Sequence, residues 1–277
     1  MLTVDFGRLR VERGMTALDA GCGQGRHTLE FLRRGCAVVG MDLAADDLRY
    51  TRYLLTALAR DREPAGSAGQ GGIPPFLALR GNALQLPFGP DRFERVICSE
   101  VLEHVADPGG AVAELARVLK PGGWIAVSVP TPFTEWAFRF ASDDYFNTPG
   151  GHVRIFTPRR LSALLGTAGL SVGDIQFEHA FHSLYWWARS VVGLHDERHP
   201  VTRHFKKILT YTFFSSQLTR AERALNYLFP KSMVLYAQKQ PGSAPPALKR
   251  RRSPGKARRP AAAGPGRSAI PRRPRAG

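Results

Sequence analysis

Three glycines and two aspartates near the start of the chain have the types and spacing of a nucleotide-binding loop. The glycines follow a short strand-like segment at alternate positions and are Gly21, Gly23 and Gly25. A glycine-rich turn lets the backbone approach a bound ligand closely, because no side chain intervenes. Asp19 precedes the glycines, and Asp42 follows 21 residues after the first of them. A carboxylate at the position of Asp42 is placed to accept hydrogen bonds from ribose hydroxyls.

The spacing of these glycines argues against a dinucleotide, whose G-x-G-x-x-G loop uses its third glycine for close packing of helix on strand. Position 26, where that glycine would fall, is Arg26. A phosphate-binding P-loop would need Gly-Lys-Ser or Gly-Lys-Thr, which the sequence lacks. Asp19 would repel a pyrophosphate but attract an ammonium or a sulfonium group. A nucleoside with a positive charge at its other end, such as S-adenosyl-L-methionine, therefore fits the loop.

The segments that position these residues alternate between strand-like and helix-like patterns. Buried strands are predicted at 16–21, 37–43, 76–83, 95–100 and 124–130. Helices are predicted between them at 26–35, 44–61 and 108–123, with a Gly- and Pro-rich loop at 62–75. Such alternation indicates a parallel sheet with helices on both faces and a ligand site at the carboxyl ends of the strands. A helix at 157–170 and strands at 171–180 and 232–240 complete the predicted domain.

Four stretches of the sequence resemble the class I S-adenosylmethionine-dependent methyltransferases, and most of all the type 11 small-molecule group that includes ubiquinone and menaquinone methyltransferases. They are LDAGCGQG, VVGMDL, the stretch from GNALQLPF to AVSVP, and GHVRIFTPRRLSALLGTAGL. The resemblance covers residues 15–178. It implies an α/β fold with a doubly wound, Rossmann-like sheet of seven strands. The last strand would be antiparallel, and a helical, aromatic-rich insert would precede it.

The resemblance also implies which residues bind the cofactor. Asp19 and the glycines would surround its methionine part, Asp42 would bind the ribose, and Leu43 would pack beside the adenine. Asn82 and Ala83 would meet the adenine edge, although the family often has Asp where Asn82 stands. Ser99 would lie near the methionine moiety. The full set is Asp19, Gly21, Gly23, Gly25, Asp42, Leu43, Asn82, Ala83 and Ser99.

Two histidines are candidates for a general base in methyl transfer to a hydroxyl or an acidic carbon. His104 lies just beyond the strand at 95–100, and His152 follows a loop after the strand at 124–130. For each histidine the alternative to catalysis is a structural role: packing against a helix for His104, and a hydrogen bond to the loop backbone for His152. Glu100 and Glu103 would orient either ring or stabilise a helix start. Arg154 would pair with an acidic substrate or with a surface acid, and no metal site is predicted.

The sequence narrows the class of methyl acceptor. Nucleic-acid enzymes that methylate amino groups resemble one another in an Asn/Asp-Pro-Pro-aromatic stretch, where this chain has CSEV. Cys98 falls inside a predicted buried strand, so it is not placed as the nucleophile of a cytosine-C5 enzyme. We therefore predict O- or C-methylation of a small acceptor, lipophilic or isoprenoid-like. The alternatives are an RNA or protein methyltransferase that uses the basic tail, and a catalytically silent, membrane-associated binding protein.

The end of the chain differs in composition from the rest. Residues 241–277 carry 11 Lys or Arg and no Asp or Glu, so they account for 11 of the 16 net positive charges. We predict a methyltransferase domain at 1–240 and a disordered, basic, Pro-rich tail at 241–277. The tail would solubilise the chain or contact RNA, DNA or anionic lipid.

The insert at about 181–230 combines aromatic residues with Lys and Arg. It would form a helical cap, a lid over a lipophilic acceptor, or amphipathic helices on a membrane surface. Three scattered cysteines and an N-terminus without an apolar segment predict a cytoplasmic protein. Peripheral attachment to the inner membrane face is an alternative location. The sequence does not indicate an oligomeric state.

Overall fold

The computed structural model describes residues 2–61, 75–141, 151–192, 199–211 and 215–242. The chain divides into a unit of residues Met1–Pro246 and a second unit, Ala247–Gly277. Nearly all of the predicted 62–75 loop and of the predicted disordered tail lies outside the described residues, as does the loop that precedes His152.

The described residues of the first unit contain a seven-stranded sheet in the order β3-β2-β1-β4-β5-β7-β6. Its strands are β1 (Thr16–Ala20), β2 (Ala37–Asp42), β3 (Phe76–Arg80), β4 (Phe93–Ser99), β5 (Leu119–Pro130), β6 (Leu170–Glu178) and β7 (Ser232–Lys239). Neighbouring strands from β3 to β5 are parallel, whereas β7 is antiparallel to both β5 and β6. The predicted doubly wound sheet with an antiparallel last strand is confirmed.

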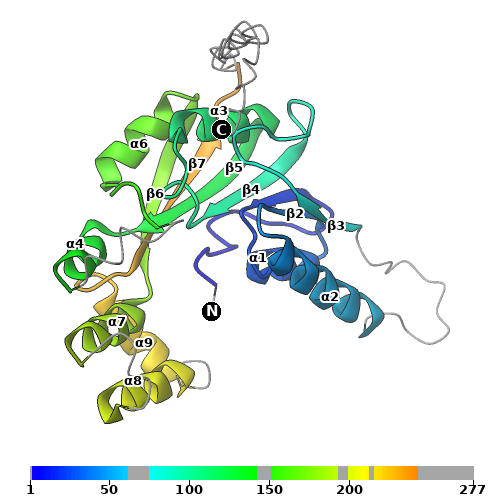
Figure 1. Ribbon diagram of the computed structural model, residues 1–277. Helices are drawn as coiled ribbons and strands as arrows, with labels where there is room; N and C mark the ends of the chain where they lie inside the picture. The colour runs from blue at the N-terminus through cyan, green and yellow to red at the C-terminus, as the bar shows by residue number, and fades with distance from the viewer. Residues whose placement is uncertain (1, 62–74, 142–150, 193–198, 212–214, 243–277) are drawn as a thin grey trace, which may run out of the picture. The chain divides into compact units, whose positions relative to one another are not determined.

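Helices cover both faces of this sheet (Figure 1). The helices on the faces are α1 (Arg26–Arg33), α2 (Ala45–Asp61), α3 (Pro108–Val118) and α6 (Pro158–Gly166). The others, α4 (Pro132–Ala141), α7 (Ala180–Val192), α8 (Pro200–Tyr211) and α9 (Ser216–Leu225), lie beyond the sheet, where α7 packs against the other three. Successive strand residues point to opposite faces, so each strand contributes to two cores. Val96 packs in the core that contains α3 and α6, and its neighbour Ile97 packs in the core that contains α1 and α2.

The helix expected at 108–123 is shorter than the sequence predicted. It begins where the Asp107 carboxylate accepts a hydrogen bond from the backbone N–H of Gly110, and it ends at Val118. Strand β5 follows directly from Leu119. Pro121 explains the early end, because a proline disfavours helical geometry at the residue before it and offers no backbone N–H.

The insert between β6 and β7 is helical, as predicted, and consists of α7, α8 and α9 within the described residues. Asn226, at the end of α9, ties the insert to the sheet. Its side-chain oxygen accepts a hydrogen bond from the backbone N–H of Ala180 at 2.8 Å, and its amide nitrogen donates to Glu178 Oε2 at 3.1 Å. Among the described residues, no helix has the length and apolar character needed to cross a membrane.

The segment before β1 packs against the start of α1. His27 Nε2 accepts hydrogen bonds from the backbone N–H groups of Thr3 and Val4, at 3.3 and 3.4 Å. Burial, together with the neighbouring Arg26, lowers the pKa of His27 to about 3, so the imidazole is neutral and keeps its acceptor nitrogen. Phe6 stacks edge-on against Phe31, with ring centroids 4.8 Å apart. The short N-terminal segment is thereby fixed beside the glycine loop.

Candidate functional site

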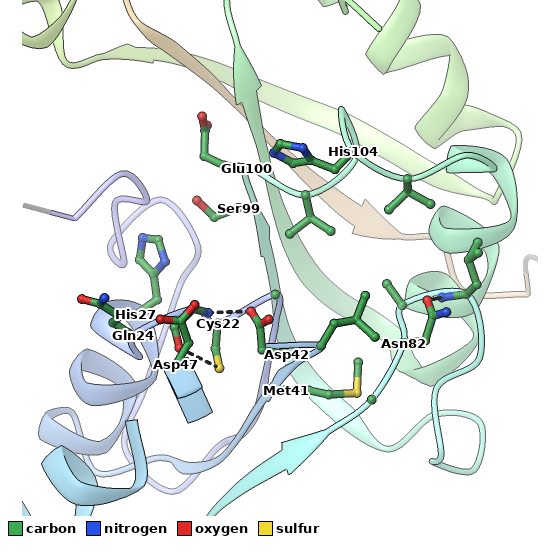
Figure 2. Close-up of a pocket in the computed structure, with 18 of the residues that line it drawn as sticks. Cys22, Gln24, His27, Met41, Asp42, Asp47, Asn82, Ser99, Glu100 and His104 are labelled. Carbon is green, nitrogen blue, oxygen red and sulfur yellow. Dashed lines mark hydrogen bonds between the residues drawn. The ribbon is translucent and has the colours of Figure 1, made fainter. Parts of the chain in front are cut away.

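A cavity of about 720 Å³ opens at the carboxyl ends of the central strands (Figure 2). Its wall is formed by the glycine loop after β1, the end of β2, residues 81–84 after β3, and residues 99–101 and 104–106 after β4. This is the edge at which doubly wound folds bind their ligands. In Figure 2, Glu100 and His104 lie together at one end of the cavity, well apart from Asn82 and Met41.

The glycine loop depends on its glycines for two different reasons. Gly21 has a φ of 79°, and a Cβ there would lie 2.2 Å from a methyl carbon of Val101. Gly25 also has a φ of 79°, and its Cβ would lie 2.6 Å from Thr51. Gly23 has a φ of 49°, but a Cβ there would have no atom within 4 Å. Gly21 and Gly25 therefore allow close packing, whereas Gly23 borders open cavity that a bound ligand can fill.

Asp42 holds the glycine loop in place from the end of β2. Its Oδ2 accepts a hydrogen bond from the backbone N–H of Gly23 at 2.8 Å, and its Oδ1 accepts one from Ala44 at 2.9 Å. Each carboxylate oxygen has a second lone pair available for a ribose hydroxyl. Leu43, beside it in the cavity wall, is 60% exposed and offers an apolar surface to a flat ring.

Asn82 takes part in a local turn at the far side of the cavity. Its side-chain oxygen accepts a hydrogen bond from the backbone N–H of Leu84 at 2.9 Å. Asn82 was expected to meet the adenine edge, and its side-chain oxygen, the atom able to accept from an adenine amino group, already has this backbone donor. Ala83 lies next to it in the cavity wall and is largely buried.

Asp19 is fully buried behind the glycine loop and does not belong to the cavity wall. Its Oδ2 accepts a hydrogen bond from the Thr28 hydroxyl at 2.7 Å, while Oδ1 has no hydrogen-bond partner among the described residues. Burial raises its pKa to about 6. A buried carboxylate oxygen without a partner is costly, so this atom fits a cationic ligand group that would approach it.

The raised pKa of Asp19 predicts how the stability of the ligand-free protein depends on pH. An acid with a raised folded-state pKa contributes stability below its unfolded value of 3.8, and this is lost as the pH rises through about 6. Relative to the Asp19→Asn variant, the wild type should lose roughly 3 kcal/mol of unfolding free energy between pH 3 and pH 7. Urea denaturation of both proteins across this range measures the difference. If the unfolding free energies of the two proteins changed with pH in parallel, the raised pKa of Asp19 would be contradicted.

A chain of hydroxyl groups leads away from the end of β4. Ser99 and Ser128 are register partners on β4 and β5, and their Oγ atoms are 2.8 Å apart. Ser128 Oγ donates to Glu100 Oε1 at 3.0 Å, which leaves Ser99 as the donor to Ser128. Glu100 has a φ of 57°, a left-handed geometry that is strained for a residue with a side chain and is concentrated at functional sites.

The two histidines predicted from the sequence lie against each other. The ring centroids of His104 and His152 are 4.7 Å apart, in an edge-to-face arrangement. His104 Nδ1 lies 3.3 Å from the carbonyl oxygen of Gly151, so it is the nitrogen that donates. His152 Nδ1 lies 2.9 Å from Oε1 of the buried Glu135. Of the pair, His104 belongs to the wall of the large cavity, and His152 lies behind it.

Glu103 is buried beneath this histidine pair, and neither of its carboxylate oxygens has a hydrogen-bond partner among the described residues. Burial, followed by the nearby Glu100 carboxylate, raises its pKa well above the ordinary value. One donor atom each from Glu103, His104 and His152 lies within 4.8 Å of the others, a spacing that a divalent ion would bridge. No metal site was predicted from the sequence.

Arg154 has a positioning role that was not predicted from the sequence. Its guanidinium donates to the backbone carbonyls of Leu102, Val105 and Ala106, and so fixes the loop that carries His104. Neither the predicted substrate acid nor a surface acid is its partner in these bonds. Glu135 and Ser128 were also missed, because nothing in their local sequence marks them.

Most of the predicted cofactor residues lie around one cavity. Those in its wall are Gly21, Gly23, Asp42, Leu43, Asn82, Ala83 and Ser99. Asp19 and Gly25 lie behind the wall, where they support the loop. Cys98 is fully buried in β4, and burial raises the pKa of its thiol, as expected for a residue that packs rather than reacts.

The chain is similar in sequence to a known protein family and to proteins of known activity. Residues 5–174 match the Methyltransferase domain family. A ubiquinone biosynthesis O-methyltransferase of Paracidovorax citrulli is 36% identical over 118 residues, which are 42% of this chain and 44% of that protein. The enzyme of the same name from Serratia proteamaculans is 27% identical over 197 residues, 69% of each chain. The chain thus matches less than half the length of the first relative and about two thirds of the second.

Solved structures share the fold at low sequence identity. An S-adenosylmethionine-dependent methyltransferase from Mesorhizobium loti superposes with a TM-score of 0.54 at 17% identity, covering 84% of this chain and 94% of its own. One from Methanosarcina mazei gives 0.54 at 19% identity, covering 87% and 99%. With the match over residues 5–174, the chain belongs to the S-adenosyl-L-methionine-dependent methyltransferase family.

Proposed function

We propose that this chain transfers a methyl group from S-adenosyl-L-methionine to a hydroxyl oxygen of a small organic acceptor. The observation that carries the proposal is that His104, backed by His152, lines the same cavity as the Asp42 carboxylate. The names of the relatives, which are O-methyltransferases, support the choice of oxygen over carbon.

In this proposal, the glycine loop and two aspartates hold the cofactor. Asp42 accepts the ribose hydroxyls, and the open space beside Gly23 takes the chain of the ligand. The unpartnered oxygen of Asp19 attracts the cationic end of the molecule from behind the loop. When bound, S-adenosyl-L-methionine supplies a methyl group activated by a sulfonium. The task of the protein is then to align the acceptor oxygen and to exclude water.

His104 is the proposed general base. Because its Nδ1 donates to the carbonyl of Gly151, its Nε2 has the lone pair that can take a proton from the acceptor hydroxyl. His152 packs edge-on against it and is itself oriented by Glu135.

We extend the proposal to the acceptor itself. Two branched apolar side chains, Val101 and Val105, contribute to the cavity wall on the loop that carries His104. Such a wall suits an aromatic hydroxyl compound, and the aromatic helices of the insert suit a lipophilic tail. We propose residues 1–240 as the catalytic unit, with the insert as the part that contacts the acceptor or the membrane in which it is dissolved.

The test is methyl transfer from methyl-labelled S-adenosyl-L-methionine to three groups of acceptors: phenols with and without an isoprenoid tail, structured RNA, and protein. We expect label in the phenols, and equal labelling by a chain that ends at Gln240. Label confined to RNA or protein, and lost from the shortened chain, would contradict the proposal. Tight cofactor binding without label in any acceptor would favour the catalytically silent alternative.

A further inference from the structure

A second group of side chains of metal-ligating type lies outside the cavity described above, where β6 is followed by α7. His179 and His182 come from this junction, and Glu222 comes from α9. One donor atom from each residue lies within 4.8 Å of the other two. The two imidazole rings meet edge-to-face with centroids 5.3 Å apart. None of the three residues belongs to the wall of the large cavity.

Two of these side chains have buried polar atoms without a partner. Glu222 is only 6% exposed, and its Oε1 has no hydrogen-bond partner among the described residues. The same is true of His182 Nδ1. Leaving such groups unsatisfied is costly, because they have given up water without gaining a partner. An unpartnered carboxylate oxygen next to an unpartnered imidazole nitrogen is the donor arrangement that a bound cation would satisfy.

The surroundings hold these donors in position. His179 Nε2 lies 3.1 Å from the Thr3 hydroxyl. Asn226 fastens the end of α9 to the first residue of α7. Outer contacts of this kind orient the ligands of protein metal sites.

Charged side chains of both signs surround the cluster. Lys231 and Arg26 oppose a cation at this point, whereas the carboxylates of Glu222 and nearby Glu178 attract one.

A small cavity beside the cluster leaves room for a further ligand. It has a volume of about 130 Å³ and is lined by both histidines together with Thr3, Arg26, Glu100, Lys231 and Ser232. Three protein ligands with an accessible fourth position characterise open zinc sites, whereas closed structural sites have four protein ligands. Arg26 and Glu100 also belong to the wall of the large cavity, so the two spaces adjoin.

We propose that His179, His182 and Glu222 bind one divalent transition-metal ion of the zinc class, with its fourth position open to the small cavity. Two imidazole nitrogens and one carboxylate suit zinc, cobalt or nickel, while calcium and magnesium prefer oxygen ligands alone. The ion would join the end of β6 and the start of α7 to α9. Through the bond between His179 and Thr3 it would also stiffen the N-terminal segment.

The test is titration of the full-length chain, first freed of metal by a chelator, with Co²⁺ as a spectroscopic probe and with Zn²⁺. We expect visible absorption bands of a low-coordinate Co²⁺ site, saturation at one equivalent for this cluster, and a rise in Tm with Zn²⁺. His182→Asn and Glu222→Gln should each weaken this binding by more than about 100-fold, beyond the effect of losing an outer contact.

His152→Asn is the matched control, because it removes a histidine from the other cluster and should leave this Co²⁺ signal unchanged. Circular dichroism and S-adenosyl-L-methionine binding verify that each variant is folded. A Co²⁺ signal that survives in both His182→Asn and Glu222→Gln, or a wild type without this signal, would overturn the proposal. Neither result bears on methyl transfer, which is measured separately.

Discussion

Replacing Asp42 with alanine is expected to weaken the binding of S-adenosyl-L-methionine by about 100-fold or more. The carboxylate is placed to accept the ribose hydroxyls, and charge-assisted hydrogen bonds contribute about 1.5–3 kcal/mol each. Two such bonds at the lower value amount to about 100-fold in the dissociation constant. The variant also loses the bonds to the backbone of Gly23 and Ala44, which shape the loop. Calorimetric titration of both proteins measures the change.

Asp46→Ala provides the control, because it removes the same charge four positions later on exposed α2. Asp46 pairs with Arg49 at the surface and does not belong to the cavity wall. The dissociation constant of the Asp46→Ala variant for S-adenosyl-L-methionine should stay within about threefold of the wild-type value, since an exposed ion pair contributes little. Equal affinity of Asp42→Ala and wild type would exclude Asp42 as the ribose-binding residue.

Replacing His104 with asparagine is expected to lower kcat by about 100-fold to 1,000-fold, the range expected for loss of a general base. The dissociation constant for S-adenosyl-L-methionine should change little, because His104 lies at the acceptor end of the cavity, far from Asn82 (Figure 2). The measurement pairs steady-state kinetics on a phenolic acceptor with calorimetry for the cofactor. A fall in kcat without a change in cofactor affinity distinguishes a proton acceptor from a residue that merely packs.

The neighbour of His104 provides a further test. In the proposed mechanism His152 acts only through its ring contact with His104, so the double variant His104→Asn/His152→Asn should be scarcely slower than the single His104→Asn variant. His204→Asn, on exposed α8, should retain wild-type kcat. Multiplicative losses in the double variant would show that the two histidines act independently. Unchanged kcat in His104→Asn would remove it from the mechanism.

That the glycine loop and Asp42 meet at one cavity could be predicted, because these residues are close in sequence and follow strand ends. The spacing of the glycines and the charge of Asp19 are enough by themselves to argue against a pyrophosphate. The distance from Gly21 to Asp42 corresponds to one helix and one strand, so local patterns were sufficient to bring the two residues to one sheet edge. The alternation of strands and helices likewise predicted the parallel part of the sheet.

The contacts around the proposed acceptor end of the cavity could not be predicted in the same way, because they join segments that are distant in the sequence. Ser99 meets Ser128 only through the register of β4 with β5. His152 contacts Glu135 in the first turn of α4. Arg154 donates to three backbone carbonyls of the loop after β4. Sequence spacing predicts neither strand register nor loop conformation, so the histidines were identified as candidates but their contact was not.

A crystal structure of the chain with S-adenosyl-L-homocysteine would show directly how the cavity holds a cofactor. We expect ribose hydroxyls on Asp42, adenine between Leu43 and Asn82, and the amino-acid end beside Gly21 on the side of Asp19. The sulfur should face the end of the cavity that holds Glu100 and His104. A ligand bound elsewhere, or a ribose without contact to Asp42, would contradict the account.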